Sequence, residues 1–144
     1  MSTHEHKRKA RSGKQHRRFF ALMSALHSHW PESHSFQPDS SEHLRAWLLV
    51  RAKHCVINTF PLESKKEAAH FAKILPIITS LMLKKHSWCR TKGNELHVCV
   101  PLSINHTECS HELFTSICAD VDAIIKAETG LDPDELFKET ERAA

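Results

Sequence analysis

The sequence is poor in the residues on which turn-rich and disulfide-bonded folds depend. Its 144 residues include only three glycines and no tyrosine, and its five cysteines are an odd number with no closely spaced pair. So few glycines argue against a β-barrel or β-sandwich, whose tight turns need positive φ angles. The cysteine pattern favours reduced thiols, and we see no apolar segment typical of a signal peptide at the N-terminus. We therefore expect a mainly helical cytoplasmic protein.

Long hydrophobic runs and several catalytic motifs are also missing. The longest strongly apolar stretch, residues 74–83, contains Pro76, and it is far shorter than the roughly twenty residues that cross a bilayer. Phosphate-binding loops and dinucleotide-binding motifs are absent. We expect no membrane partner and no nucleotide cofactor.

Positive charge is present and is concentrated at one end. Residues 1–18 carry seven basic side chains and one acidic side chain, a net charge of +6, whereas the whole chain has a net charge of +3. The last 26 residues, 119–144, carry eight acids and three bases. A dense basic segment is typical of a protein that binds a polyanion, and nucleic acid is the leading partner. The acidic end could fold back on the basic arm, mimic nucleic acid or form a solvated face; we favour the solvated face.

The hydrophobic spacing predicts an α+β protein of about five helices with a small, mostly antiparallel sheet. Residues 1–12 have nothing to bury and are expected to form a disordered basic arm, followed by a single α+β domain over residues 13–144. Ser12 and Gln15 match a capping box at the start of a helix over about residues 14–30, which Pro31 ends. A loop over residues 31–40 and a helix from Ser40 or Ser41 to about Lys53 follow.

The second half of the chain gives clearer boundaries. We expect a strand over residues 55–60, a helix capped by Ser64 that Pro76 kinks or breaks, and a hairpin of residues 88–90 with 95–100. A helix capped by Ser110 and ended by Gly130 is the strongest prediction, and a short helix follows Asp132.

Seven cations at the N-terminal end are the candidate nucleic-acid contacts. They are Lys7, Arg8, Lys9, Arg11, Lys14, Arg17 and Arg18. Each neutralised phosphate releases a counterion, which gives affinity without sequence preference. Aromatic side chains nearby could stack bases, but Phe19 and Phe20 lie on or beside the apolar stripe and are expected to be buried. Phe36, in the polar loop, is the more plausible exposed aromatic.

Histidine and cysteine spacings give little support to a metal site or to catalysis. The three closest groupings are His27 with His29, His97 with Cys99, and Cys109 with His111. None has the spacing that supplies two zinc ligands from one turn. Cys109 with His111, or Cys55 with His54, lacks the glycine-rich loop of a nucleophilic enzyme. We expect neither a metal nor an enzyme.

The stretch Lys14-Gln-His-Arg-Arg-Phe-Phe-Ala-Leu-Met-Ser-Ala-Leu-His-Ser-His-Trp30 resembles the signature of a family of small uncharacterised phage and prophage proteins. The later segments Glu42-His43-Leu44, Pro101-Leu102-Ser103-Ile104-Asn105 and Ser110-His111-Glu112-Leu113-Phe114 occur in a similar order. More loosely, the layout is similar to that of the NinB (Orf) recombination proteins of lambdoid phages. The chain differs from these proteins in its bare basic arm, and in the helical segment at residues 64–85.

The NinB resemblance implies a small α+β homodimer that acts in a bacterial host cell. It implies binding of single-stranded DNA and exchange of a host single-strand-binding protein for a recombinase. We therefore interpret the chain as a non-catalytic nucleic-acid-binding protein that assists recombination or replication. The alternative is a phage-encoded interaction module that inhibits or adapts a host enzyme through its acidic C-terminal helices.

Overall fold

The computed structural model describes the backbone of residues 3–104 and 110–143, and the side chains of residues 13–104 and 110–142. Within these ranges the chain forms five helices and one three-stranded antiparallel sheet, which confirms the α+β class. The chain splits into two compact units: Met1–Ala52 with Ser103–Ala144 (unit 1), and Lys53–Leu102 (unit 2). The single domain that we predicted over residues 13–144 stays a prediction.

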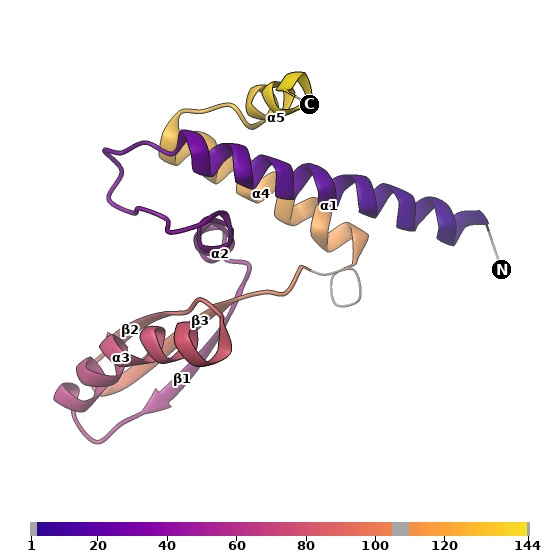
Figure 1. Cartoon of the computed structure of the whole chain (residues 1–144). Helices are drawn as coiled ribbons and strands as arrows, with labels where there is room; N and C mark the ends of the chain where they lie inside the picture. Colours follow the sequence, from indigo (N-terminus) through magenta and orange to yellow (C-terminus); the bar gives the residue numbers. More distant parts are fainter. Residues whose placement is uncertain (1–2, 105–109, 144) are drawn as a thin grey trace. The chain divides into compact units, whose positions relative to one another are not determined.

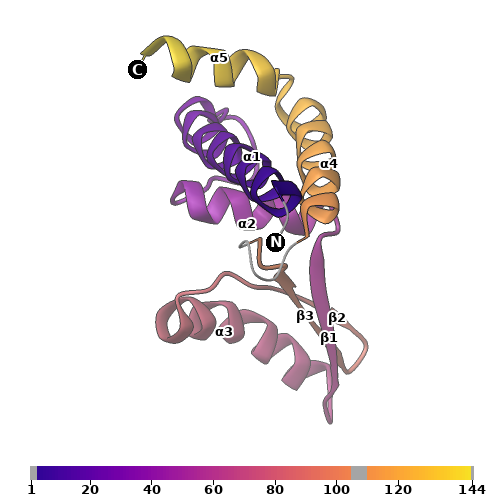
Figure 2. The ribbon, with the colours of Figure 1, turned by 90° about the vertical axis from the view of Figure 1, so that its right-hand side faces the viewer.

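Unit 1 is helical. It contains α1 (Thr3–His29), α2 (Ser41–Arg51), α4 (His111–Thr129) and α5 (Pro133–Ala143). Helix α1 contacts each of the other three helices. Figures 1 and 2 show α4 running alongside α1, and the C-terminal helix α5 packing on α1.

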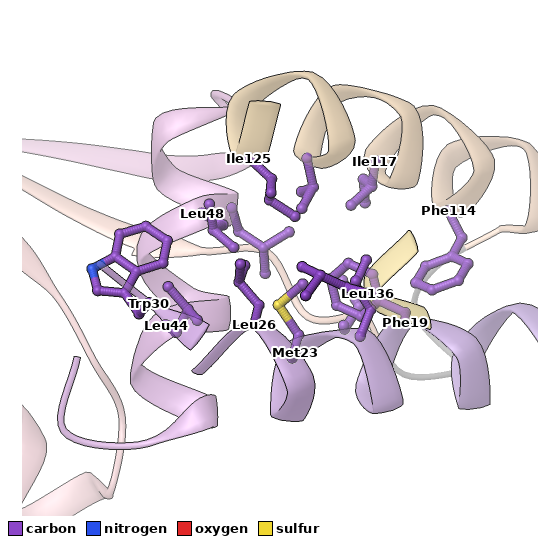
Figure 3. Packing of buried hydrophobic residues seen from close by; sticks show 14 residues of the cluster. Phe19, Met23, Leu26, Trp30, Leu44, Leu48, Phe114, Ile117, Ile125 and Leu136 are labelled. Atoms are coloured by element: carbon purple, nitrogen blue, oxygen red, sulfur yellow. The ribbon is translucent and has the colours of Figure 1, made fainter. Parts of the chain in front are cut away.

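The core of unit 1 forms where the apolar stripes of these helices meet (Figure 3). Apolar residues three and four positions apart lie on one side of a helix, so each helix turns one stripe inward. The fully buried side chains of this cluster come from three helices. They are Phe19, Leu22, Met23 and Leu26 on α1, Leu44, Leu48 and Leu49 on α2, and Phe114, Ile117, Val121 and Ile125 on α4.

The ends of α4 and the start of α5 follow the predicted capping chemistry. The Ser110 side chain accepts a hydrogen bond from the Leu113 N–H at 3.1 Å, and Gly130 has a φ of 73° at the C-terminal end. A positive φ is the conformation for which glycine is preferred at this position. Asp132 accepts from the Asp134 N–H at 3.0 Å, and α5 begins at Pro133.

Helix α1 begins at Thr3, so its first turns fall within residues 1–12, whose side chains lie outside the described residues. Lysine, arginine and alanine in this segment favour helix, and no proline interrupts it. Ser12, which we predicted to cap the helix together with Gln15, lies inside α1, and its side chain is outside the described residues. The Gln15 side-chain amide donates to the Thr115 hydroxyl at 3.4 Å.

Unit 2 is a three-stranded sheet with one helix. Strand β1 (Cys55–Pro61) leads into α3 (Lys65–Leu83), and β2 (Trp88–Lys92) and β3 (Glu95–Pro101) form the predicted hairpin. The strand order is β1-β3-β2, with both neighbours antiparallel to β3, so β1 and β2 are the edge strands.

Helix α3 packs against β2 and β3, on one face of the sheet (Figure 2). Alternate strand residues point to the same face, and the apolar Leu96 and Val98 of β3 are buried. We predicted that Pro76 would kink or break this helix. The helix does not break: it continues through Pro76 to Leu83, and the Thr79 hydroxyl donates to the carbonyl groups of Leu75 and Pro76.

Candidate nucleic-acid interface

The seven predicted contact residues all lie on α1. Lys7, Arg8, Lys9 and Arg11 belong to its first turns, and their side chains lie outside the described residues. Lys14, Arg17 and Arg18 belong to the part of α1 whose side chains are described, and these three have different environments.

Lys14 and Arg17 are exposed on a helix that is anchored in the core. Between them, His16 is buried and stacks on Phe114 of α4, with ring centroids 4.1 Å apart and an interplanar angle of 12°. Phe19, two residues after Arg17, is 2% exposed. The buried neighbours hold this turn of α1 against α4, so the backbone that carries the two exposed cations is fixed by packing.

Arg18 is engaged within the chain. Its guanidinium donates to the Asp134 carboxylate of α5 at 2.6 Å, and lies 5.3 Å from the centroid of the Phe137 ring. The Arg18 side chain is 29% exposed, whereas that of Asp134 is 71% exposed. A phosphate that binds Arg18 must therefore compete with a carboxylate already in place.

The carboxylates of Asp122, Asp132 and Asp134 lie close enough to interact electrostatically, and Arg18 interacts with Asp122 as well. Burial raises the pKa of Asp122 above its ordinary value, the positive charge of Arg18 lowers it, and the negative charges of Asp134 and Asp132 raise it. A carboxyl group whose charged form is disfavoured by burial and by like charges gains from a nearby cation. Arg18 thus stabilises acidic residues from α4 and α5.

The acidic C-terminal helix folds back on α1. Asp134 contacts Arg18, Glu139 lies 3.7 Å from His29, and Leu136 between them is 5% exposed. We favoured a solvated acidic face, and the acidic side chains of α5 are indeed exposed, Asp134 and Glu139 among them. The other side of α5, which carries the buried Leu136, packs on α1. The sequence separation of 116 residues between Arg18 and Asp134 hides their pairing from local pattern analysis.

One aromatic contact was missed by the sequence analysis. Phe19 is buried as predicted, but Phe20 is 41% exposed, and the guanidinium of Arg45 on α2 lies 4.9 Å from the centroid of its ring. The contact is a cation–π interaction. Burial lowers the pKa of Arg45, and the nearby Glu42 carboxylate raises it. The available signal was the position of Phe20 beside, and not within, the apolar stripe of α1.

Phe36 is not an exposed platform. Its ring stacks on Trp47 at 4.6 Å and 8°, and its carbonyl oxygen accepts a hydrogen bond from the Trp30 indole N–H at 2.7 Å. The adjacent His34 and Arg51 both contact the Glu128 carboxylate at 2.7 Å. These contacts tie the loop after α1 to α2 and α4, so Phe36 stabilises the fold.

The described residues contain no group of three or more histidine, cysteine or acidic side chains that is arranged to hold a metal ion. Cys109 of the third predicted grouping lies outside the described residues. Burial, followed by a hydrogen bond with Cys55, raises the pKa of the Cys99 thiol to about 12, so this thiol is protonated at neutral pH.

Comparison with known protein families, curated proteins and solved structures finds no match for this chain. Among the described residues, no helix combines the length and the apolar character that spanning a membrane requires.

Proposed function

We propose that α1 binds single-stranded DNA through the phosphate backbone, without catalysis, in support of recombination or replication. The observation that carries this proposal is the exposure of Lys14 and Arg17 on a helix that is fixed by buried neighbours on both sides. Charges held in place lose less conformational entropy on binding than charges on a free tail.

The cations before Ser12 extend the same element. Because α1 is continuous from Thr3, positions 7, 11 and 14 recur at steps of four and three, the spacing that puts helix positions on one side. Arg8 and Lys9 add charge to the same turns. A helix with several basic positions along one side is suited to follow a polyanion backbone.

Phe20 gives the interface an aromatic component. It follows Arg17 by three residues, so the two side chains leave the same side of α1. Proteins that bind single strands combine cations with exposed aromatic rings on which bases stack. Because Phe20 is 41% exposed and already faces the Arg45 guanidinium, we propose it as the stacking position.

Salt dependence tests the proposal. The affinity of the full chain for a fluorescent single-stranded oligonucleotide is measured between 50 and 300 mM salt by anisotropy. Replacing Lys14 and Arg17 by alanine should reduce the log–log slope by about 1.4, since each lost phosphate contact removes about 0.7 for a single strand. The matched control replaces Lys126 and Lys138, exposed cations on α4 and α5, and should change the slope little.

The interaction-module alternative predicts a different outcome. If the wild-type chain does not bind the oligonucleotide at 50 mM salt, the nucleic-acid proposal fails. The acidic residues of α5 that remain exposed, such as Glu135, then become the candidate surface for a host protein. Equal loss of slope in the test pair and the control pair would instead show binding that depends on net charge alone.

A further inference from the structure

The outer edge of β1 is an unpaired strand edge of unit 2. No strand of the described residues pairs with this edge, and the register of β1 with β3 runs from Cys55 to Pro61 without a bulge. Edge strands usually carry charges, bulges or proline that prevent pairing with another chain. The other edge strand, β2, has Arg90 and Lys92, whereas β1 has no charged residue and has proline only at its last position.

The hydrogen-bond pattern shows which backbone groups of β1 point outward. The Leu62 N–H donates to the Asn94 carbonyl and the Leu102 N–H donates to the His54 carbonyl, across residues that are directly opposite in the register. Backbone groups alternate between the two sides of an antiparallel strand. Even-numbered residues of β1 therefore bond to β3, and the N–H and C=O groups of Cys55, Ile57 and Thr59 point to the open edge.

Three of the exposed side chains of β1 are large and apolar. Val56 is 48% exposed, Ile57 59% and Phe60 49%. Unit 2 buries few apolar side chains in return, with Ala68, Leu96 and Val98 the buried ones among the described residues. A small unit that exposes this much apolar surface gains stability by association.

We propose that the open edge of β1 pairs antiparallel with β1 of a second copy of this chain, with the two-fold axis at Asn58. In this register Val56 lies opposite Phe60 of the other copy, a β-branched residue against an aromatic ring. Ile57 lies opposite Thr59 of the other copy, so the outward backbone groups meet. About six main-chain hydrogen bonds form, because the nitrogen of Pro61 has no hydrogen.

Charges at the two ends of the strand select this register. Lys53 precedes β1 by two residues and Glu63 follows it by two residues, and both are exposed. An axis at Asn58 brings Lys53 of each copy to the level of Glu63 of the other, which gives two opposite-charge pairs. An axis at Ile57 would not align them. In this register β1 and its flanking residues are therefore complementary in charge to the same segment of the second copy.

The contact is expected to be weak. The three exposed apolar side chains of β1 supply roughly 300 Å² per chain at about 100 Å² each, below the roughly 800 Å² per partner of a standard interface. We therefore expect a dimer with a dissociation constant in the micromolar range.

Introducing a charge at the two-fold axis tests the pairing. Asn58 is exposed, and the axis places it opposite its own copy, where side chains approach closely. Asn58→Lys and Asn58→Glu each bring like charges together, and each should weaken association at least about tenfold. An equimolar mixture should restore association to within about threefold of wild type. Sedimentation equilibrium of the full chain from 1 to 300 μM, with a thiol reductant and without nucleic acid, measures all four samples.

The controls make each outcome decisive. Thr91→Lys places the same added charge on the β2 edge, where it should not change association. Restoration in the mixture excludes misfolding, because a misfolded variant would not pair. A wild-type chain that stays monomeric to 300 μM overturns the proposal, and so do single variants that associate as wild type does. If the equimolar mixture of the two Asn58 variants does not restore association, the proposal that the two-fold axis lies at Asn58 is overturned.

Discussion

Removing the partner of Arg18 is the sharpest test of what the acidic helix does to the basic one. In the structure a carboxylate oxygen of Asp134 lies 2.6 Å from a guanidinium nitrogen of Arg18, and the two form an ion pair. Asp134→Asn removes the negative charge while keeping the size of the side chain. If α1 binds phosphates, we expect this variant to bind single-stranded DNA more tightly than wild type, because Arg18 becomes available as an additional contact.

The size of the effect follows from counterion release. One additional phosphate contact steepens the log–log salt slope by about 0.7 on a single strand, which corresponds to about fivefold higher affinity at 0.1 M salt. The cost to the fold is small, because the Asp134 side chain is 71% exposed and an exposed ion pair contributes about 0–1 kcal/mol. The variant should therefore remain folded while its affinity rises.

The assay is the anisotropy titration at several salt concentrations, with a matched control. Glu135→Gln removes one negative charge from the adjacent position of α5, where the nearest cation is Lys138 at 3.7 Å. It changes the net charge equally but does not release Arg18. Unchanged affinity in Asp134→Asn, or an equal gain in both variants, would refute the reasoning that Arg18 is held back by Asp134.

Two further predictions concern stability. Hydrogen bonds from His34 and then Arg51 lower the pKa of Glu128, so the stabilisation by its carboxylate is present above the ordinary pKa of about 4.3 and is lost as the pH falls through the lowered value. Glu128→Gln should lower the free energy of unfolding by about 1–2 kcal/mol at pH 7 and by less at pH 3, as measured by thermal melts followed by circular dichroism. Phe114→Ala, which removes a fully buried ring, should cost about 3–5 kcal/mol in urea unfolding; a comparable loss in Leu113→Ala, at a 37% exposed neighbour, would contradict this assignment.

Local chemistry made much of this fold predictable. The limits of α4 follow from Ser110 and Gly130, which act within a few residues of themselves, and the apolar stripe between them is long. The Ser64 cap of α3 and the hairpin around Gly93 are local in the same way, and Gly93 has a φ of 62°. Features of this kind depend on backbone geometry that a few neighbouring residues determine.

Properties that depend on distant partners were not predictable. The exposure of Phe20 depends on how far α2 covers α1, and the engagement of Arg18 depends on the return of α5 after more than a hundred residues. The basic segment before Ser12 has no apolar stripe to bury, so only its helix-favouring residues could indicate that α1 extends to Thr3. The division into two units has no signal in composition, since no glycine-rich or serine-rich linker precedes Lys53 or follows Leu102.

Pairing through β1 would change how the chain binds a long strand. A dimer carries two α1 helices, so a strand that reaches both is held by two sites, and the second contact is gained at high effective concentration. Asn58→Lys should then match wild type on an oligonucleotide of about 8 nucleotides but bind one of about 60 nucleotides more weakly and less cooperatively. Charge alone predicts the opposite sign, because the variant has one more cation. Tighter binding of the long strand by Asn58→Lys would therefore show that the two α1 helices act independently.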